Sequence, residues 1–379
     1  MNELARLVLV AAVLLTLPPG SGFRASASSP IRVGILREQE HVTVRSDRPV
    51  ELSDTSLQRI VLAPGSYEIL PSADAIEVSG AGRFIGLIRL APAEGARLHV
   101  GNRTYRGMIE IRSTPARRLT VVNELGLEEY LYGVLKMEVD PRWPAEALKA
   151  QAVAARTLAL YSLGRYQREG YDVRATTETQ VYGGVAAEDP RTTAAVEATR
   201  GEIMTFQDRP IFAAFHSDSG GHTESSEHVW GGRYVYLKGV PDPYSAGAGS
   251  QRWMVRLDLG VFEERLRRTG RPVTSIMSIE LAELTPSGRV QSIRITSGTG
   301  TVTLKGTELR SILGADQLKS TLFSVRFRPD DPSAVEFIGR GAGHGVGMSQ
   351  WGARGHALLG RGYQEILRYY YSGVSYETR

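Results

Sequence analysis

Short runs of alternating apolar and polar positions fill the first third of the chain. Residues 31–35 and 42–45 place apolar side chains at every second position, as strands with one buried face do. The segments 109–112 and 119–122 continue the pattern. We therefore predict a β-rich N-terminal region over residues 28–125.

The period of the apolar positions changes after this region. Residues 127–136 have the pattern of a short helix and residues 144–169 that of a long one. Pro144 suits a first helical turn, and Gly170 ends the run. We expect the segment 126–250 to form a helical core that carries the chemistry.

Strand-like alternation returns between residues 252 and 330, with one helical stretch at 261–269. This predicts a second β-rich region over residues 251–334. A last strand at 335–338, a glycine-rich turn and two helical segments then make up residues 335–379. Strands, helices and strands in this order predict an α+β fold.

The N-terminal segment has the order of a secretory signal peptide. Arg6 precedes the apolar run Leu7–Leu17, Pro18–Gly20 breaks any helix, and Ala25–Ala27 offers a small-residue cleavage site. The run is shorter than the roughly 20 residues that span a bilayer. We expect residues 1–27 to be removed and the mature chain, without an integral membrane segment, to reach the cell wall or periplasm.

Composition narrows the function classes. A chain of 379 residues exceeds the size that one core serves well. Its formal net charge of +4, without long basic clusters, argues against nucleic acid as a partner. The chain has no cysteine, so thiol nucleophiles and cysteine-ligated metal centres are excluded.

The long central helix is rich in alanine and apolar on every side, which is typical of a buried helix. Three polar residues interrupt it: Lys149, Gln151 and Arg156. Buried polar groups need partners or must line a cavity. Two interpretations stay open: a structural ion pair, such as Arg156 with Glu138 or Asp140, or a cleft wall that holds a polar ligand.

A polar loop carries His216, His222 and His228 at intervals of six residues, with Glu224 between them. Imidazoles and carboxylates are zinc ligands, but the spacing matches no standard zinc motif. The loop is therefore either a metal site, which would favour a metal-dependent hydrolase, or a polar surface segment.

A glycine-rich turn near the C-terminus contains His344, Ser349, Gln350 and Trp351. Its glycines let the backbone approach a ligand closely, and it lacks the G-K-[S/T] ending of a phosphate loop. The titratable imidazole, the two polar side chains and the flat indole ring suit a sugar chain, which offers hydroxyl groups and an apolar ring face. A tight structural turn is the alternative.

Taken together, the ordered motifs of the chain resemble the stage II sporulation protein D family (SpoIID/LytB). They extend over nearly all of the expected mature chain. The matching segments are Leu127–Val134, Met137–Glu138, Glu146–Thr157, Gln180–Gly184, His216–Ser217, Ser219–Gly221, Glu224, Val229–Gly231 and Gly343–Gln350.

The resemblance implies a lytic transglycosylase that cleaves peptidoglycan glycan strands lacking stem peptides. The family's catalytic glutamate falls on Glu138, and its cleft-lining lysine, glutamine and arginine fall on Lys149, Gln151 and Arg156. The matched motifs lead us to expect further substrate contacts from Tyr182, His216, Ser219, Gly220, Glu224, His344, Ser349 and Gln350.

No cofactor is required by this chemistry. Some relatives carry a metal in the histidine loop, held by histidine and cysteine, so zinc bound by His216, His222 and His228 stays open. The other branch of the family is described as amidase enhancers. A non-catalytic, peptidoglycan-binding enhancer of an N-acetylmuramoyl-L-alanine amidase is therefore the alternative function.

A single carboxyl group can serve a lytic transglycosylase, whereas glycoside hydrolysis normally needs two. Glu138 would protonate the leaving oxygen and then accept the proton of the C6 hydroxyl of N-acetylmuramic acid, giving a 1,6-anhydro product. An acid of this kind needs a raised pKa, which desolvation supplies. The apolar neighbours Met137, Val139 and Trp143 favour it.

Overall fold

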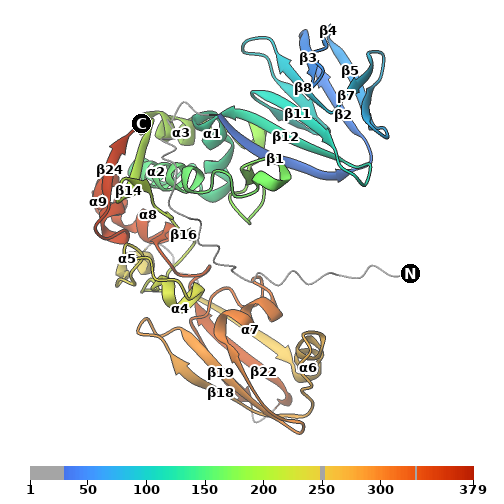
Figure 1. The fold of residues 1–379 in the computed structure, drawn as a ribbon. Coiled ribbons are helices and arrows are strands. Elements are labelled where there is room, and N and C mark those ends of the chain that lie inside the picture. Colours follow the sequence, from blue (N-terminus) through green and yellow to red (C-terminus); the bar gives the residue numbers. More distant parts are fainter. Residues whose placement is uncertain (1–29, 248–251, 329–330) are drawn as a thin grey trace.

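The computed structural model describes residues 30–247, 252–328 and 331–379. The expected signal peptide, residues 1–27, lies outside the described residues. Three parts follow one another along a crescent: a β-sandwich, a helical centre and a third lobe (Figure 1). Within the described ranges, no helix combines the length and the apolar character that crossing a membrane requires.

The N-terminal part is a sandwich of two sheets. A seven-stranded sheet has the order β13-β1-β12-β11-β8-β3-β4, and a six-stranded sheet has the order β10-β9-β2-β5-β6-β7. Alternate side chains such as Val42 and Val44 are buried between them, as the period-2 pattern predicts. The strands are β1 (Pro30–Gln39), β2 (Val42–Ser46), β3 (Val50–Asp54), β4 (Arg59–Leu62), β5 (Gly65–Pro71), β6 (Ala75–Val78), β7 (Gly82–Ile85), β8 (Leu87–Pro92), β9 (Leu98–Val100), β10 (Arg103–Tyr105), β11 (Met108–Ser113), β12 (Leu119–Gly126) and β13 (Val173–Arg174).

The central part surrounds helix α2, which packs against α1, α3, α8, α9 and β14. These neighbours bury its alanines on every side, which explains its lack of a polar face. The elements of this part are α1 (Leu127–Glu138), α2 (Ala145–Tyr161), η1 (Gln167–Glu169), η2 (Gly184–Ala187), α3 (Pro190–Ala198), β14 (Glu202–Phe206), β15 (Arg209–Pro210), β16 (Phe215–His216), α4 (Ser226–Trp230), α5 (Pro243–Gly247), β23 (Met348–Ser349), α8 (Gln350–Leu358), α9 (Tyr363–Tyr370) and β24 (Ser375–Thr378).

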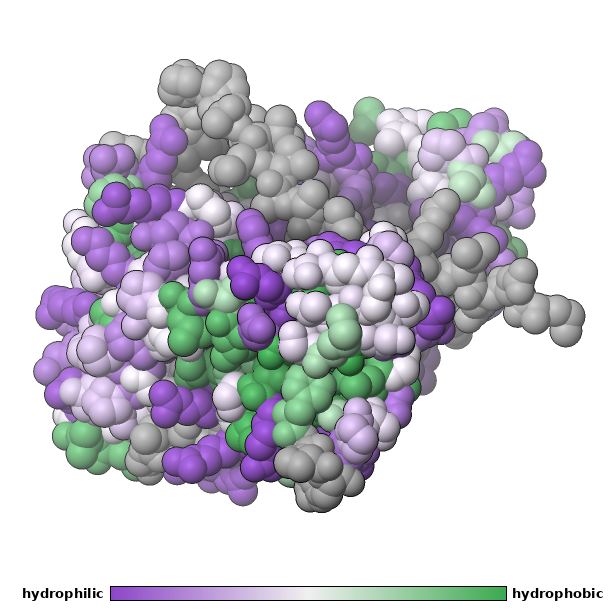
Figure 2. Space-filling model, turned by 90° about the horizontal axis from the view of Figure 1, so that it is seen from below, coloured by the Kyte–Doolittle hydropathy of each residue, from purple (hydrophilic) through white to green (hydrophobic). Residues whose placement is uncertain are grey.

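The third lobe has its own core, in which Phe262, Leu266 and Phe337 are buried between two three-stranded sheets and two helices. Seen from the side of this lobe, apolar residues gather in the middle of the surface among hydrophilic ones (Figure 2). The sheet orders are β17-β22-β21 and β18-β19-β20. The elements are β17 (Arg252–Asp258), α6 (Leu259–Arg268), β18 (Ile276–Leu284), β19 (Val290–Ser297), β20 (Gly300–Lys305), α7 (Gly306–Leu313), β21 (Phe323–Arg328) and β22 (Asp331–Arg340).

The α+β fold class is confirmed, with corrections to three boundaries. The short helix runs on to Glu138, while the long helix ends at Tyr161 instead of residue 169. Gly164 ends it, because its φ of 74° is left-handed and incompatible with continuing the helix. The boundary expected at residues 334 and 335 falls inside β22, which pairs with β17 from Ala334 to Arg340.

A buried ion pair joins α1 to α2. The Arg156 guanidinium donates to both carboxylate oxygens of Glu128, at 2.8 and 2.7 Å, and to the carbonyl oxygens of Val196 and Glu202. The amide of Gly201 donates to the same carboxylate. The Arg156 side chain has no exposed surface. The expected substrate contact from Arg156 is therefore wrong. A structural ion pair does form, but its acid is Glu128 and not Glu138 or Asp140.

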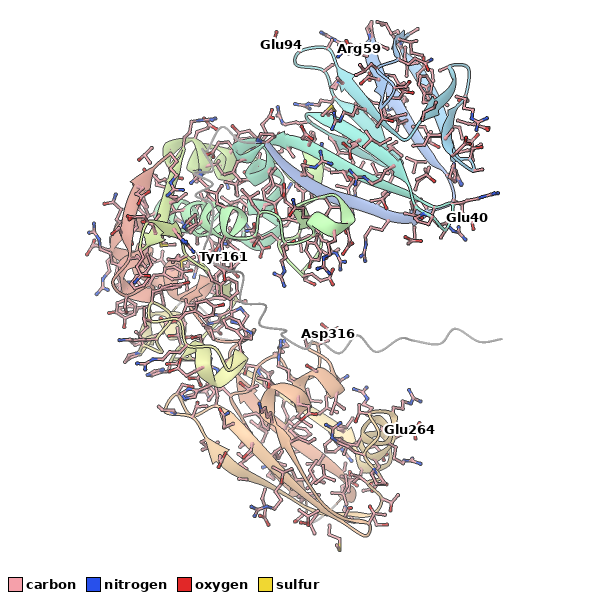
Figure 3. The ribbon with its side chains drawn as sticks, in the orientation of Figure 1. Glu40, Arg59, Glu94, Tyr161, Glu264 and Asp316 are labelled. Atoms are coloured by element: carbon pink, nitrogen blue, oxygen red, sulfur yellow. The ribbon has the colours of Figure 1, made fainter. Side chains whose placement is uncertain are left out.

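We predict that Arg156→Met lowers the free energy of unfolding by about 3–5 kcal/mol, because it leaves the Glu128 carboxylate buried without a counter-charge. Urea denaturation of the purified chain measures the change. The matched control is Arg59→Met on the outer edge of the sandwich (Figure 3), where the guanidinium pairs with Glu51 at 3.4 Å in an exposed position. We expect a loss of about 1 kcal/mol or less there. Equal losses in the two variants would contradict the structural role of Arg156.

Candidate active site

Glu138 is the last residue of α1 and lies at the edge of its buried face. Tyr130 and Val134 stand eight and four positions before it on the same helical stripe, and both are fully buried. Glu138 itself is only partly exposed. Burial raises the pKa of its carboxyl group, and a hydrogen bond from the backbone of Val181 acts in the opposite direction. The group therefore holds its proton to a higher pH than an exposed glutamate does.

The environment of Glu138 differs sharply from that of Asp140. Among the described residues, no charged side chain contributes to the pKa shift of Glu138. The Asp140 carboxylate accepts from the Arg142 side chain at 2.6 Å, and this hydrogen bond leads the causes that lower its pKa to about 2. Of the two neighbouring acids, Glu138 is the one whose surroundings favour the protonated form that a proton donor needs.

The segment after η1 packs against α1 through Tyr182. Its ring lies 5.3 Å from that of Tyr130, and its hydroxyl donates to the Asn123 side chain at 2.8 Å. Gly133 allows this approach, because a Cβ there would lie 2.5 Å from the Tyr182 ring. Tyr182 is buried, so the expected substrate contact is corrected: Tyr182 holds the backbone of Val181 beside Glu138.

Several buried polar groups of the centre have hydrogen-bonding atoms without a partner among the described residues. Three of these atoms are Nε2 of Gln151, Nε2 of Gln180 and Nε2 of His216. The Gln151 carbonyl accepts from Gln350 at 3.5 Å, so these two predicted site residues do lie together. Unsatisfied buried groups of this kind are rare in folded proteins and mark positions where a ligand or water can bind.

Two tryptophans connect the Glu138 end of α1 to α8. Val139 packs with Trp143 and with Leu148 of α2. The Trp143 ring in turn lies 5.2 Å from that of Trp351 in α8, tilted by 56°. Both rings are partly exposed. This pair offers a flat apolar surface near the chain segment that carries Glu138.

The Lys149 side chain contacts α2 and α9. Its ammonium group pairs with Glu146 at 2.8 Å and lies 5.7 Å from the centre of the Tyr363 ring. Glu146 also accepts from the Tyr363 amide, so the group ties α2 to α9. Lys149 stays partly exposed, and its expected contact with substrate remains a prediction.

His216 and His344 face one another with ring centres 5.5 Å apart. Burial lowers the pKa of His216 well below 6.5, so its ring is neutral at pH 7. Since Nδ1 lies 3.1 Å from the Val346 carbonyl, which can only accept, Nδ1 carries the proton and Nε2 is a free acceptor. Burial also lowers the pKa of His344, to about 4, and Trp230 lies 5.1 Å from its ring.

Ser219 and Ser349 support the loop and the turn from inside. Ser219 donates to Asp242 at 2.7 Å, and Ser349 caps α8 by accepting from the Gly352 amide. Both side chains are fully buried, which corrects their expected contact with substrate. Gly220 has a φ of 69°, and a Cβ would come within 3.1 Å of the Arg340 backbone, so its role is to let the loop approach the end of β22.

Glu224 joins the loop to the third lobe. Its carboxylate accepts from Thr285 at 2.5 Å, from Ser287 at 2.7 Å and from its own neighbour Ser225 at 2.8 Å. Nδ1 of His228 lies 2.8 Å from Oε1 of Glu224, the oxygen that also accepts from the Ser225 amide. Glu224 is buried and saturated with partners, so the expected substrate contact is replaced by a structural role.

The three histidines that were considered as zinc ligands do not converge. The Nδ1 atom of His222 lies 2.6 Å from the Thr223 carbonyl, while His228 bonds to Glu224 and His216 to Val346. Within residues 30–247, 252–328 and 331–379, no group of three or more histidine and acidic side chains is placed to hold a metal ion. The donor set of this loop does not fit zinc.

Sequence reasoning missed the roles of two residues, Tyr130 and Gln180, and the contact between Trp143 and Trp351. Tyr130 could have been found from its spacing, because it lies on the same helical stripe as Glu138. Gln180 and the tryptophan pair depend on contacts between distant segments, for which one sequence carries no signal.

We predict that Glu138→Gln raises the melting temperature at pH 7. A carboxyl group whose pKa is higher in the folded than in the unfolded chain loses stability as the pH rises through that interval, and the loss persists above it. Glutamine removes this loss, so the gain should be present at pH 7 and absent at pH 3, below the unfolded pKa of about 4.3.

Thermal unfolding at the two pH values measures this difference. Glu94→Gln is the control, since Glu94 lies on an outer loop of the sandwich (Figure 3) and is exposed. We expect no comparable pH-dependent gain there. A melting temperature of Glu138→Gln equal to that of the parent at both pH values would contradict the desolvation of Glu138.

Comparison with known proteins places these features in a family. The family described as stage II sporulation protein matches residues 116–206, which include α1, α2 and Glu138. A second family, described as a domain of unknown function, matches residues 244–347 and so covers the third lobe.

Individual relatives agree with this placement. An uncharacterized protein of Brachyspira hyodysenteriae is 38% identical over 257 residues, covering 68% of each chain. The "Stage II sporulation protein D" of Bacillus subtilis is 33% identical over 270 residues, which cover 67% of this chain and 75% of that protein. The "Amidase enhancer" of the same organism is 33% identical over 290 residues, 65% of this chain but only 40% of that longer protein. The resemblance seen in the motifs is thus confirmed, and the chain belongs to the stage II sporulation protein D family.

Proposed function

We propose that this chain is an exported lytic transglycosylase that cleaves peptidoglycan glycan strands lacking stem peptides, with Glu138 as its acid and base. The observation that carries the proposal is the desolvated carboxyl group of Glu138, whose pKa is raised without any charged partner among the described residues. A raised pKa favours the protonated form, which is the form that a general acid needs when it meets the substrate.

The reaction needs only this one carboxyl group. Glu138 donates its proton to the glycosidic oxygen as the bond from that oxygen to C1 of N-acetylmuramic acid breaks. The resulting carboxylate then accepts the proton of the C6 hydroxyl while O6 attacks C1 and closes the 1,6-anhydro ring. Glu138 ends protonated, no water is consumed, and the Val181 amide stabilises the carboxylate between the two steps.

The unpartnered polar groups and the tryptophan pair of the central part suit an uncharged sugar. The unpartnered amide groups of Gln151 and Gln180 can donate to hydroxyl or acetamido oxygens, and Nε2 of His216 can accept from a hydroxyl. The Trp143–Trp351 pair can stack on the apolar face of a ring. Each of these groups is neutral, in keeping with a substrate whose reacting centre carries no charge in the ground state.

We predict that Glu138→Gln and Glu138→Ala reduce the release of 1,6-anhydro products by about 10²–10⁴-fold, the usual effect of losing a general acid–base group. Mass spectrometry of peptide-free wall strands digested with the purified chains measures the products. Asp140→Asn is the matched control: Asp140 is bound by Arg142 and ionised, so we expect its variant to keep the parental rate. Undiminished release by both Glu138 variants would remove Glu138 from the mechanism.

The second candidate is an enhancer of a cell-wall amidase, favoured by the relative that bears the name "Amidase enhancer". A chain in this role would bind glycan strands and stimulate the amidase without cleaving a glycosidic bond itself.

We predict that the parent chain releases anhydro products from stripped strands in the absence of any amidase, and that Glu138→Gln does not. The measurement adds an N-acetylmuramoyl-L-alanine amidase to whole peptidoglycan and follows peptide release with each chain. Equal stimulation by the parent and by Glu138→Gln, together with no anhydro product from either, would favour the enhancer.

A further inference from the structure

A groove of about 310 Å³ lies in the third lobe, where β22 leads into the glycine-rich turn. Arg252 of β17 and Arg340 of β22 stand on its walls, and Leu322, Phe323 and Ile338 form apolar parts of its lining. We call it the two-arginine groove. It is separate from the residues around Glu138 described above.

The arrangement of the two arginines is electrostatically unfavourable when no ligand is bound. Arg252 and Arg340 are directly opposite one another in the antiparallel pair β17–β22, so both side chains leave the same face of the sheet, roughly 5 Å apart at Cβ. Like charges in this relation destabilise a sheet. Both residues are exposed, and neither forms an ion pair with any residue in the described ranges.

The other end of the same sheet is built differently. There Arg256 pairs with Asp331, and Arg326 pairs with Glu336 at 2.6 Å. The positive charges of this face are thus matched by acids at one end and unmatched at the groove. The contrast shows that the sheet can pair its arginines, and that the groove lacks the acids to do so.

Two further arginines of the third lobe donate to backbone carbonyl groups. Arg289 is buried and donates to the carbonyl oxygens of Ser219 and His222, both at 2.7 Å. Arg310 donates to the carbonyl oxygens of Leu318 and Lys319. Burial lowers the pKa of Arg289 to about 10, while the nearby acids Glu224 and Asp218 act in the opposite direction. The charge of Arg340 adds to the effect of burial, so Arg289 and Arg340 lie close enough for their like charges to interact.

We propose that the two-arginine groove binds the lactyl carboxylate of an N-acetylmuramic acid residue in the glycan strand. This inference rests on the proposed function, because it adds a second contact along the same strand. A guanidinium fork matches a carboxylate in geometry, and the apolar lining suits a sugar ring or the lactyl methyl group. The volume is at the small end of ligand pockets, about 300–1,000 Å³, and so takes one sugar residue.

The groove would give the chain its preference for stripped strands. In a strand that retains its stem peptides, the lactyl group ends in an amide and carries no charge at that atom. Removal of the peptide leaves a free carboxylate, which the arginines recognise. The selectivity of the enzyme then arises in the third lobe, at a distance from the bond that breaks.

Strand binding by the full chain carrying Glu138→Gln, which leaves the strand intact, tests the proposal. The probes are fluorescently labelled peptide-free wall strands, wall strands with stem peptides, and chitin oligosaccharides of matched length, which lack the lactyl group. Arg252→Gln and Arg340→Gln are added singly. The matched control is Arg294→Gln, which removes one charge from β19 in the other sheet of the lobe, where Arg294 lies 3.7 Å from Glu280.

We expect each groove variant to bind stripped strands about tenfold more weakly, as the loss of a charge-assisted contact implies. Binding of chitin and the behaviour of Arg294→Gln should stay at parental levels. Added salt should reduce the preference of the parent for stripped strands over chitin. Equal affinity in all three arginine variants, equal binding of stripped strands and chitin, or tighter binding of strands with stem peptides would each overturn the proposal.

The outcome is separable from that of the proposed function. If Arg252→Gln and Arg340→Gln weaken strand binding while the parent releases no anhydro product, the groove stands and the enzymatic proposal falls. If the parent releases product and the groove variants bind as the parent does, the reverse holds.

Discussion

Helix α1 is fixed at both ends, and the candidate active site depends on that constraint. At its first turn, the buried Arg156 guanidinium donates two hydrogen bonds to the Glu128 carboxylate. At its last residue, Tyr182 packs against the helix and brings the Val181 amide to Glu138. The two glutamates are ten positions apart, which corresponds to about 15 Å of helix. A structural ion pair at one end therefore sets the position of a desolvated carboxyl group at the other, so the pair serves the site without touching a substrate.

Residue patterns predicted the elements of this fold better than they predicted its contacts. The period-2 strands of the sandwich and the alanine-rich helix follow from local sequence, because burial on one face or on all faces leaves a direct pattern. Glu138 could be named from the motif that surrounds it. The end of α2 at Tyr161 was missed, since Gly164 and η1 interrupt a segment whose apolar positions still look helical.

The roles of polar residues were the least predictable part. Arg156, Tyr182 and Glu224 belong to matched motifs, yet all three are buried and bound to protein groups. A sequence shows that a polar residue is required at a position, but only the partner shows why. The partners here come from segments 28 to 63 residues away, and a single chain without its fold gives no means of finding them.

The carboxylate of Glu224 and the guanidinium of Arg289 make the histidine loop and the third lobe one structure. Thr285 and Ser287 of the lobe donate to the Glu224 carboxylate. The Arg289 guanidinium donates to two carbonyl groups of the loop. The family matches do not follow this connection. The second match begins at residue 244, so it includes Arg289 but not the loop that carries Glu224. A third lobe transplanted from a relative would need to carry Thr285, Ser287 and Arg289 to keep these contacts. The lobe is thus not an interchangeable module, and evolution can vary its outer surface far more freely than the edge that faces the loop.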